Sequence, residues 1–348
     1  MKTLPLLRRS GAASILALGA TLLASAPLRA QSAAAPVEGQ LSNFMSRDPK
    51  DVGGQIALLT QEVYGLKTEL IAANFQLEYA GRIRMQRVWF ASSTADKPTI
   101  PASIFAPART VAGKKYPALV FVHGGAHIQL TQEWFPWIEE AVQRGYVVIY
   151  PEYRGSSGQG ETIFENNYGV TDLTDVLAAA AYVAGKDYVD PARLGIFAHS
   201  RGGMIELRAL EVEPKRFKAA VGIAGLSDLV SFMGYKTEAR RQDIASQKNY
   251  GGKLPDKNLP AYIGVSPAFF VEQIETPVLL LSTTGDATVP YQLHNKRIIE
   301  ALKAYGKIYD EHLYEVAPGG HGFPFADTPE ARDSMKRTFD WFAKFLSP

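Results

Sequence analysis

The sequence predicts an α/β fold, in which a mostly parallel sheet is flanked by helices on both faces. Short runs of large apolar residues, each too brief for a helix, alternate along the chain with longer amphipathic stretches. One such run, 194–197, leads into a serine between small residues, and a glycine-rich loop follows another run at 118–122. Parallel sheets carry their sites at the carboxyl ends of the strands, so both features indicate one site at that edge.

The first 30 residues have the pattern of a secretory signal peptide. Lys2, Arg8 and Arg9 precede an uncharged apolar stretch that is too short to cross a membrane, and Ala30 offers a small residue for cleavage. The Arg8-Arg9 pair leaves the general and twin-arginine export routes both open. We therefore expect a bacterial protein that is periplasmic or secreted.

Composition excludes several other classes of protein. Cleavage after Ala30 would remove four basic residues and no acidic one, so the formal charge would fall from +2 to about −2. That balance gives neither the basic footprint of a nucleic-acid-binding protein nor a polybasic membrane anchor. The chain has no cysteine, so it has neither a disulfide nor a thiol for lipid attachment.

Residues 31–51 are polar and rich in small residues, which predicts a flexible lead-in, and residues 52–81 form a helical segment. We expect its apolar stripe to pack on the main body, or alternatively to pair two copies in a homodimer. Gly65 within it costs roughly 1 kcal/mol relative to alanine, which weakens the coiled-coil interpretation. The stripe advances in alternating steps of four and three: Val52, Ile56, Leu59, Val63, Leu66, Leu70, Ala73 and Leu77.

Residues 82–348 are predicted to form one α/β domain. Two antiparallel strands, 82–90 and 99–105, open it, and residues 226–270 form an insert that should roof the pocket. Further strands are expected at 118–122, 146–150, 194–197, 219–224, 277–282 and 309–316, and helices at 133–144, 172–183, 204–210, 291–303 and 329–345.

Ser200 lies at a sharp turn between a strand and a helix. Ala198 and Gly202, two positions to either side, are small enough to let the strand and the helix pass closely. Such a turn exposes the Ser200 hydroxyl and directs the backbone N–H of Arg201 at whatever that hydroxyl attacks. A serine that only caps a helix is the alternative interpretation.

A nucleophilic serine requires a base and an acid that orients the base. His321 lies in a glycine-rich loop after the last strand, and Asp286 follows the strand before it. The chain order of serine, acid and histidine is that of the α/β-hydrolase fold. Asp228 is the other candidate acid, but its place beside Ser227 favours a helix cap.

The loop 121–127 is a candidate oxyanion hole. Its glycines free the N–H groups of Gly125 and Ala126 to join that of Arg201. His123 and His127 are four residues apart on a strand end and a loop, so a zinc pair is not expected. We predict no metal and no cofactor.

Six motifs in one order resemble the catalytic domain of the prolyl oligopeptidase family, from about residue 82 to the C-terminus. The resemblance implies an α/β-hydrolase fold, a triad of Ser200, Asp286 and His321, and an acyl-enzyme route. The motifs are His123-Gly-Gly, Tyr153-Arg-Gly-Ser-Ser-Gly158, Ala198-His-Ser-Arg-Gly-Gly203, Ser266-Pro267 before 277–281, Asp286 with Val289-Pro290, and Gly320-His-Gly-Phe323.

The departures from the family bear on the substrate. Ala198 replaces the first glycine of the serine motif, and Ser282-Thr283 stands where the family commonly has His-Gly. The large propeller domain that the family's peptidases use to admit short peptides is absent from the sequence. Two substrate classes therefore remain open: peptides, or small apolar or aromatic esters. Activity on the esters would make the protein a carboxylesterase. Most remote is a non-catalytic protein that binds or dimerises through the striped helix.

Aromatic residues are expected to wall the pocket, which would favour apolar or aromatic acyl groups. Arg201 should either meet a carboxylate of the substrate or pair with a nearby acid. The expected wall residues are Phe232, Met233, Tyr235, Tyr250, Tyr262, Phe269 and Phe270 in the insert, with Trp134, Phe135 and Trp137 on another side.

Overall fold

The computed structural model describes residues 51–347. The predicted signal peptide and all but the last residue of the predicted lead-in lie outside these residues. The chain divides into two units, Met1–Gln55 and Ile56–Pro348, and only the start of helix α2 (Val52–Glu78) is described in the first unit. None of the helices described is both long and apolar enough to cross a membrane.

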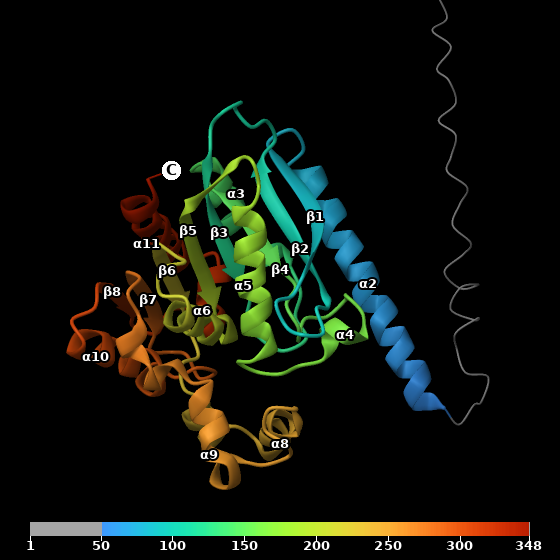
Figure 1. Ribbon diagram of the computed structural model, residues 1–348, viewed down its shortest axis with the longest axis vertical. Helices are drawn as coiled ribbons and strands as arrows, with labels where there is room; N and C mark the ends of the chain where they lie inside the picture. The colour runs from blue at the N-terminus through green and yellow to red at the C-terminus, as the bar shows by residue number, and fades with distance from the viewer. Residues whose placement is uncertain (1–50, 348) are drawn as a thin grey trace, which may run out of the picture. The chain divides into compact units, whose positions relative to one another are not determined.

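An eight-stranded sheet forms the centre of the second unit, in the order β1-β2-β4-β3-β5-β6-β7-β8 (Figure 1). β1 pairs antiparallel with β2, β2 pairs antiparallel with β4, and the remaining pairs are parallel. This confirms the predicted fold class and the antiparallel strand pair. The strands are β1 (Ile83–Ala91), β2 (Thr99–Pro107), β3 (Tyr116–Val122), β4 (Val147–Pro151), β5 (Val189–His199), β6 (Ala219–Ile223), β7 (Val278–Thr283) and β8 (Tyr309–Tyr314).

Helices lie on both faces of the sheet because its central strands are apolar on both sides. In β3, Ala118, Val120 and Val122 join one buried cluster, whereas Leu119 and Phe121 join the other. The first cluster includes side chains of α5, α6 and α10, and the second those of α2, α3 and α11. These helices are α3 (Phe135–Gln143), α5 (Thr171–Ala184), α6 (Arg201–Val212), α10 (Asn295–Ala304) and α11 (Pro329–Leu346).

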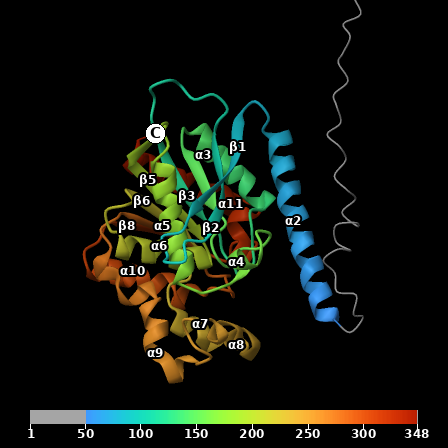
Figure 2. The same cartoon turned by 45° about the vertical axis from the view of Figure 1, so that its right-hand side comes forward.

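A third buried cluster lies beyond the carboxyl ends of the strands. The short helices α7 (Leu229–Tyr235), α8 (Glu238–Ser246) and α9 (Pro255–Gly264) lie together in the segment 226–270, at the lower end of the molecule in Figure 2. Their apolar side chains pack on Tyr168 and on Met204 of α6. The segment is thereby anchored next to the turn that carries Ser200.

Helix α2 packs on the body, but not through the apolar stripe that the sequence indicated. Its buried residues are Ile71, Ala72 and Phe75. The Phe75 ring meets that of Phe135 in α3 at 4.9 Å, edge to face. All eight stripe residues are exposed instead. The expectation that the stripe faces the body is therefore wrong, because α2 has two apolar faces and the sheet takes the other one.

Candidate active site

Ser200 occupies a strained turn between β5 and α6. Its φ of 59° and ψ of −123° lie in a region that residues with a side chain rarely adopt. A Cβ on Gly202 would lie 2.4 Å from the carbonyl oxygen of Val122, and one on Gly203 would lie 2.6 Å from the Cα of Gly225. Only glycines fit at such distances, so the strand and the helix approach closely and hold Ser200 at the end of the sheet.

The structure places the three predicted triad residues in one chain of hydrogen bonds. The His321 Nε2 lies 2.8 Å from the Ser200 Oγ, and the His321 Nδ1 lies 2.7 Å from Asp286 Oδ2. The other carboxylate oxygen, Asp286 Oδ1, accepts the N–H groups of Thr288 and Val289, each at 2.8 Å. The carboxylate is thus held by the backbone and orients the imidazole toward the serine.

Asp228 caps a helix, which is the role that the sequence favoured for it. Its Oδ1 accepts the N–H groups of Val230 and Ser231 at 2.9 and 3.1 Å and so caps α7. Its Oδ2 pairs with Arg297. Neither carboxylate oxygen contacts His321.

His199 supports the loop that carries His321. Burial lowers the pKa of His199 to about 3, so its ring is neutral and its Nε2 donates to the main-chain oxygen of His321 at 3.0 Å. The two rings lie 4.9 Å apart. Sequence patterns could not predict this contact, because the two histidines are 122 residues apart in the chain.

His123 and His127 take different partners. The His123 Nδ1 lies 2.9 Å from the oxygen of Gly124 and its Nε2 lies 2.9 Å from Ser156 Oγ, whereas the His127 ring stacks on that of Phe164 at 3.7 Å. Burial lowers the pKa of His123 to about 3 and raises that of the neighbouring Glu152 to about 8. At neutral pH both groups are therefore uncharged, and their 3.8 Å contact is not an ion pair.

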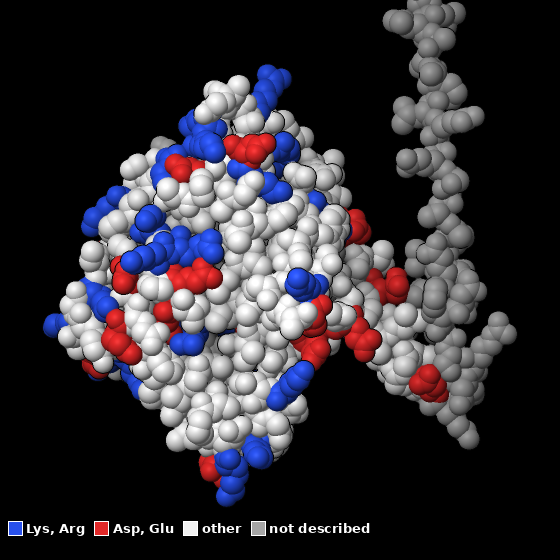
Figure 3. Space-filling view, in the orientation of Figure 1, with Lys and Arg blue, Asp and Glu red and all other residues white. Residues whose placement is uncertain are grey.

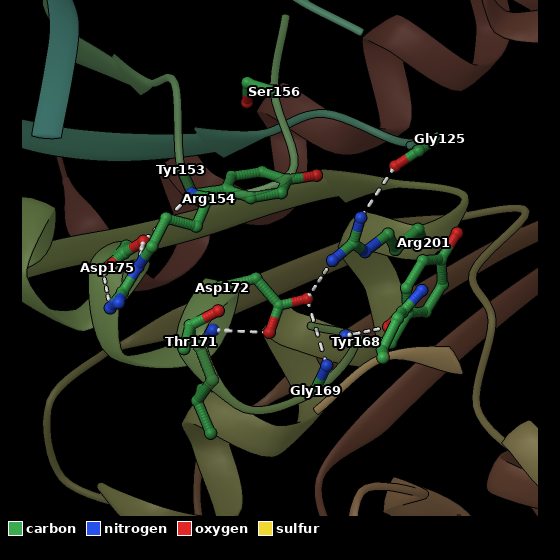
Figure 4. Close-up of polar contacts among 12 residues, drawn as sticks. Gly125, Tyr153, Arg154, Ser156, Tyr168, Gly169, Thr171, Asp172, Asp175 and Arg201 are labelled. Carbon is green, nitrogen blue, oxygen red and sulfur yellow. Dashed lines mark hydrogen bonds and ion pairs between the residues drawn. The ribbon is translucent and has the colours of Figure 1, made fainter. Parts of the chain in front are cut away.

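Arg201 pairs with a nearby acid, one of the two alternatives that the sequence left open. Figure 4 shows its guanidinium between Asp172 and the loop of Gly125. Arg201 Nη2 donates to Asp172 Oδ2 at 2.6 Å, and Nη1 donates to the Gly125 oxygen at 3.2 Å. The guanidinium also lies 3.7 Å from the centre of the Tyr168 ring. Arg201 and Asp172 are both buried, so the side chain is a brace between α5 and the glycine-rich loop.

The glycine-rich loop lies directly against Ser200. A Cβ on Gly124 would lie 2.6 Å from the Ser200 Cβ, so only glycine fits at that position. Within the described part of the chain, the backbone N–H groups of Gly125, Ala126 and Arg201 have no hydrogen-bond acceptor. The three predicted oxyanion donors are therefore free to receive a ligand oxygen.

Two hollows meet at Ser200. One has a volume of about 540 Å³, and the other, about 860 Å³, extends past His321 to Ile128, Trp134 and Phe325. Of the residues predicted to form the wall, Phe232 and Trp134 line a hollow, and the other eight do not. Met233, Tyr250, Tyr262, Phe135 and Trp137 are buried in the core, and Tyr235, Phe269 and Phe270 lie outside both hollows. The smaller hollow is lined by Gly125, Tyr168, Ser200, Arg201, Leu226, Phe232, Lys236, Arg240, Thr288 and Val289.

Lys236 is a site residue that sequence reasoning missed. Its Nζ donates to the Thr288 oxygen at 2.9 Å, and no carboxylate among the described residues lies within ion-pair distance. The other two cations of the hollow are neutralised, Arg201 by Asp172 and Arg240 by Asp243. On the face of the molecule shown in Figure 3, basic and acidic side chains are interspersed rather than gathered by sign.

Curated proteins are similar to this chain in sequence. The chain is 28% identical over 265 residues to the uncharacterized peptidase YuxL of Bacillus subtilis, covering 73% of this chain and 38% of the relative. It is 27% identical over 217 residues to dipeptidyl-peptidase 5 of Porphyromonas endodontalis, covering 60% of this chain and 31% of the relative. The chain thus spans well under half the length of these curated relatives.

Solved structures share the fold. A puromycin-hydrolyzing peptidase of Mycobacterium tuberculosis superposes with a TM-score of 0.61 at 28% identity, over 77% of this chain and 40% of that one. An acylaminoacyl peptidase of Pyrococcus horikoshii superposes with a TM-score of 0.66 at 22% identity, over 78% and 43%. Residues 133–348, more than half of the sequence, match the model of the prolyl oligopeptidase family. The chain therefore belongs to the prolyl oligopeptidase family of serine hydrolases, as its motifs indicated.

Proposed function

We propose that this protein is an exported serine peptidase that cleaves acyl bonds of short peptides through Ser200, His321 and Asp286. One observation carries the proposal: the unbroken hydrogen-bond chain from the Ser200 hydroxyl through His321 to Asp286, with distances of 2.8 and 2.7 Å. Relatives named dipeptidyl peptidase and acylamino-acid-releasing enzyme support the peptide substrate. Export rests on the signal-peptide pattern of the first 30 residues.

The proposed reaction runs in two halves. The Ser200 oxygen attacks the carbonyl carbon while its proton passes to His321 Nε2, and the leaving amine then takes that proton as the scissile bond breaks. Water attacks the resulting ester, again giving a proton to His321, which returns it to Ser200 as the acid leaves. Asp286 accepts a hydrogen bond from the His321 Nδ1–H throughout, and its negative charge stabilises the positive charge on the imidazole ring.

The oxyanion of each tetrahedral intermediate is assigned to the free N–H groups of Arg201, Gly125 and Ala126. One such donor typically lowers the barrier by roughly 3–4 kcal/mol. A trans peptide points its N–H away from its C=O. The bond from Arg201 to the Gly125 oxygen therefore fixes the direction of the Ala126 N–H, so Asp172 and Arg201 act as positioning residues for the loop.

The smaller hollow beside Ser200 is proposed to hold the acyl group. Leu226, Phe232 and Val289 provide an apolar wall, and Lys236 adds an ammonium group that no carboxylate neutralises among the described residues. A cation that no carboxylate neutralises favours a substrate that carries a negative charge. We expect an acyl group with an apolar body and an acidic substituent.

Labelling with a fluorophosphonate tests the assignment of the nucleophile. The wild-type protein should be labelled, Ser200→Ala should not, and Ser227→Ala, which changes a nearby buried serine, should be labelled like the wild type. Equal labelling of Ser200→Ala, or none of the wild type, would overturn the proposal.

The substrate class is tested separately with aminoacyl p-nitroanilides and p-nitrophenyl esters in parallel. Hydrolysis of the anilides supports a peptidase, whereas hydrolysis of the esters alone makes the protein a carboxylesterase. A preference for glutamyl over leucyl anilides that disappears in Lys236→Met supports the acidic substituent. No such preference in the wild type would refute it.

A further inference from the structure

Helix α2 exposes a continuous row of large apolar side chains, which we name the seam: Val52, Ile56, Leu59, Val63, Leu66, Leu70, Ala73 and Leu77. Val63 is 62% exposed, Leu70 59% and Leu77 80%. Single exposed apolar residues are common on protein surfaces, but a contiguous row of this length marks an interaction site. The seam therefore needs a partner that the described part of the chain does not provide.

The exposure of the seam does not mean that α2 lacks a place on the body. The opposite side of the helix is already in contact with it. The Tyr64 ring lies 6.4 Å from that of Phe164, Thr68 Oγ1 accepts from Gln129 Nε2 at 2.9 Å, and Phe75 is fully buried. The helix is thus fixed on one side and apolar on the other.

The spacing of the seam is that of a helix pair. Steps of four and three average 3.5 residues, the period of a left-handed coiled coil. In heptad notation the a positions are Ile56, Val63, Leu70 and Leu77, and the d positions are Val52, Leu59, Leu66 and Ala73. In the central residues 56–66, β-branched residues lie at a and leucine lies at d, a combination that favours two parallel strands over larger assemblies. We propose that α2 pairs in parallel with α2 of a second copy of this chain, so that the protein is a homodimer.

The charges beside the seam agree with the parallel arrangement. Glu62 is at a g position and Lys67 is at the e position five residues later. In a parallel pair, Glu62 of each chain therefore meets Lys67 of the other. An antiparallel pair would instead bring g positions together, so Glu62 would face another g residue and would not meet Lys67.

A membrane surface fits the seam less well than a second copy. Helices that lie on membranes are rich in lysine and arginine on their polar side. The polar side of α2 carries the single basic residue Lys67 against Glu62, Glu69 and Glu78, and Glu69 pairs with Arg87 of β1. This side therefore lacks the cluster of cations that binds anionic lipid headgroups, whereas Glu62 and Lys67 can pair with the same residues of a second copy.

Sedimentation velocity on the full chain tests the proposal, with Leu66→Lys as the variant that breaks the seam. The wild type should sediment as a dimer at micromolar concentration, and Leu66→Lys should weaken the dimer at least about 100-fold and sediment as a monomer. Ala57→Lys adds the same charge to α2 at an exposed position off the seam and should remain a dimer. Thermal unfolding followed by circular dichroism checks that each variant is folded. A monomeric wild type, or a dimer that Leu66→Lys leaves unchanged, would overturn the proposal.

A charge exchange tests the parallel orientation. Glu62→Lys places two lysines opposite each other in a parallel pair and should weaken the dimer several-fold, and adding Lys67→Glu should restore it. If Glu62→Lys instead strengthens the dimer, the helices pair in antiparallel orientation and the proposed geometry is wrong. Binding to anionic vesicles, with no self-association, would assign the seam to a membrane and also overturn the proposal.

Discussion

The turn at Ser200 is tightly packed by the rest of the chain, whereas helix α2 leaves one face uncovered. At the turn, Ser200 adopts a strained backbone, and a Cβ on Gly202 would lie 2.4 Å from a backbone oxygen. In α2, a Cβ on Gly65 would have no atom within 4 Å, and a whole apolar row is exposed. The turn is complete within one chain, whereas the helix carries a face that the described part of the chain does not cover. Substitutions at the turn should therefore cost function or stability, and those on the seam of α2 should change association instead.

The largest expected effect is on the acid that orients His321. Asp286→Asn keeps the shape of the side chain but removes the negative charge beside Nδ1, so kcat should fall by about 10,000-fold with the fold intact. Steady-state kinetics measure this change.

Asp228→Asn is the matched control for Asp286→Asn. It should keep kcat and lose no more than about 1 kcal/mol of unfolding free energy, because asparagine still caps α7 and only the ion pair with the partly exposed Arg297 is lost. If Asp228→Asn gives the large loss in kcat and Asp286→Asn does not, Asp228 is the acid.

The crowding of the turn is tested by Gly202→Ala. The added methyl group meets the main-chain oxygen of Val122, which a side-chain rotation cannot relieve. The free energy of unfolding should fall by about 3 kcal/mol, at the upper end for overpacking, as measured by urea denaturation. An alanine variant of wild-type stability would show that strand and helix are not packed as closely as described.

The burial of Glu152 is tested by the pH dependence of the free energy of unfolding. Its pKa is raised to about 8 from an ordinary 4.5, so between these values the folded protein holds a proton that the unfolded chain releases. Its contribution to stability is present below pH 4.5 and is lost as the pH rises to about 8, by about 1.4 kcal/mol per pH unit. Glu152→Gln should abolish that loss.

The measurement is the difference between wild-type and Glu152→Gln unfolding free energies from pH 5 to 8. Using the difference matters because His123, with a pKa of about 3, contributes in the opposite direction, losing stability as the pH falls below 6.5. Parallel curves for the two proteins would show that Glu152 is ionised in the folded state.

The smallest effect is expected on α2 itself. Gly65→Ala lies off the seam in open space, so it should stabilise the protein by about 1 kcal/mol through helix propensity alone. Thermal unfolding at fixed protein concentration measures it. A destabilised variant would mean that another group lies against Gly65, contrary to the open space found around it.

Local patterns predicted much of the molecule. Strand and helix periodicity located the sheet, and small residues around Ser200 located the turn, because both signals act over a few neighbouring residues. The positions of Asp286 and His321 after successive strands placed them at one edge, and the structure brings them together. Their catalytic role remains a prediction.

Contacts between residues far apart in the chain could not be predicted from sequence patterns. Arg201 and Asp172 are 29 residues apart, and nothing local selects that acid over others for the buried guanidinium. Periodicity identified an apolar stripe on α2 but not which face the sheet would take, since Ile71 and Phe75 form a second face. In the segment 226–270, apolar composition did not distinguish pocket wall from core, so Tyr250 and Tyr262 were wrongly expected to line the pocket.

The two backbone bonds to Asp286 have a consequence for the histidine loop. Because Thr288 and Val289 fix the carboxylate, its position does not depend on the ring that it touches. In a His321→Gly variant the acid and the alcohol would remain at either end of a gap the size of one imidazole. Free imidazole dissolved in the buffer could then bind in this gap, hydrogen-bonded to both Asp286 and Ser200, and would restore part of the lost turnover.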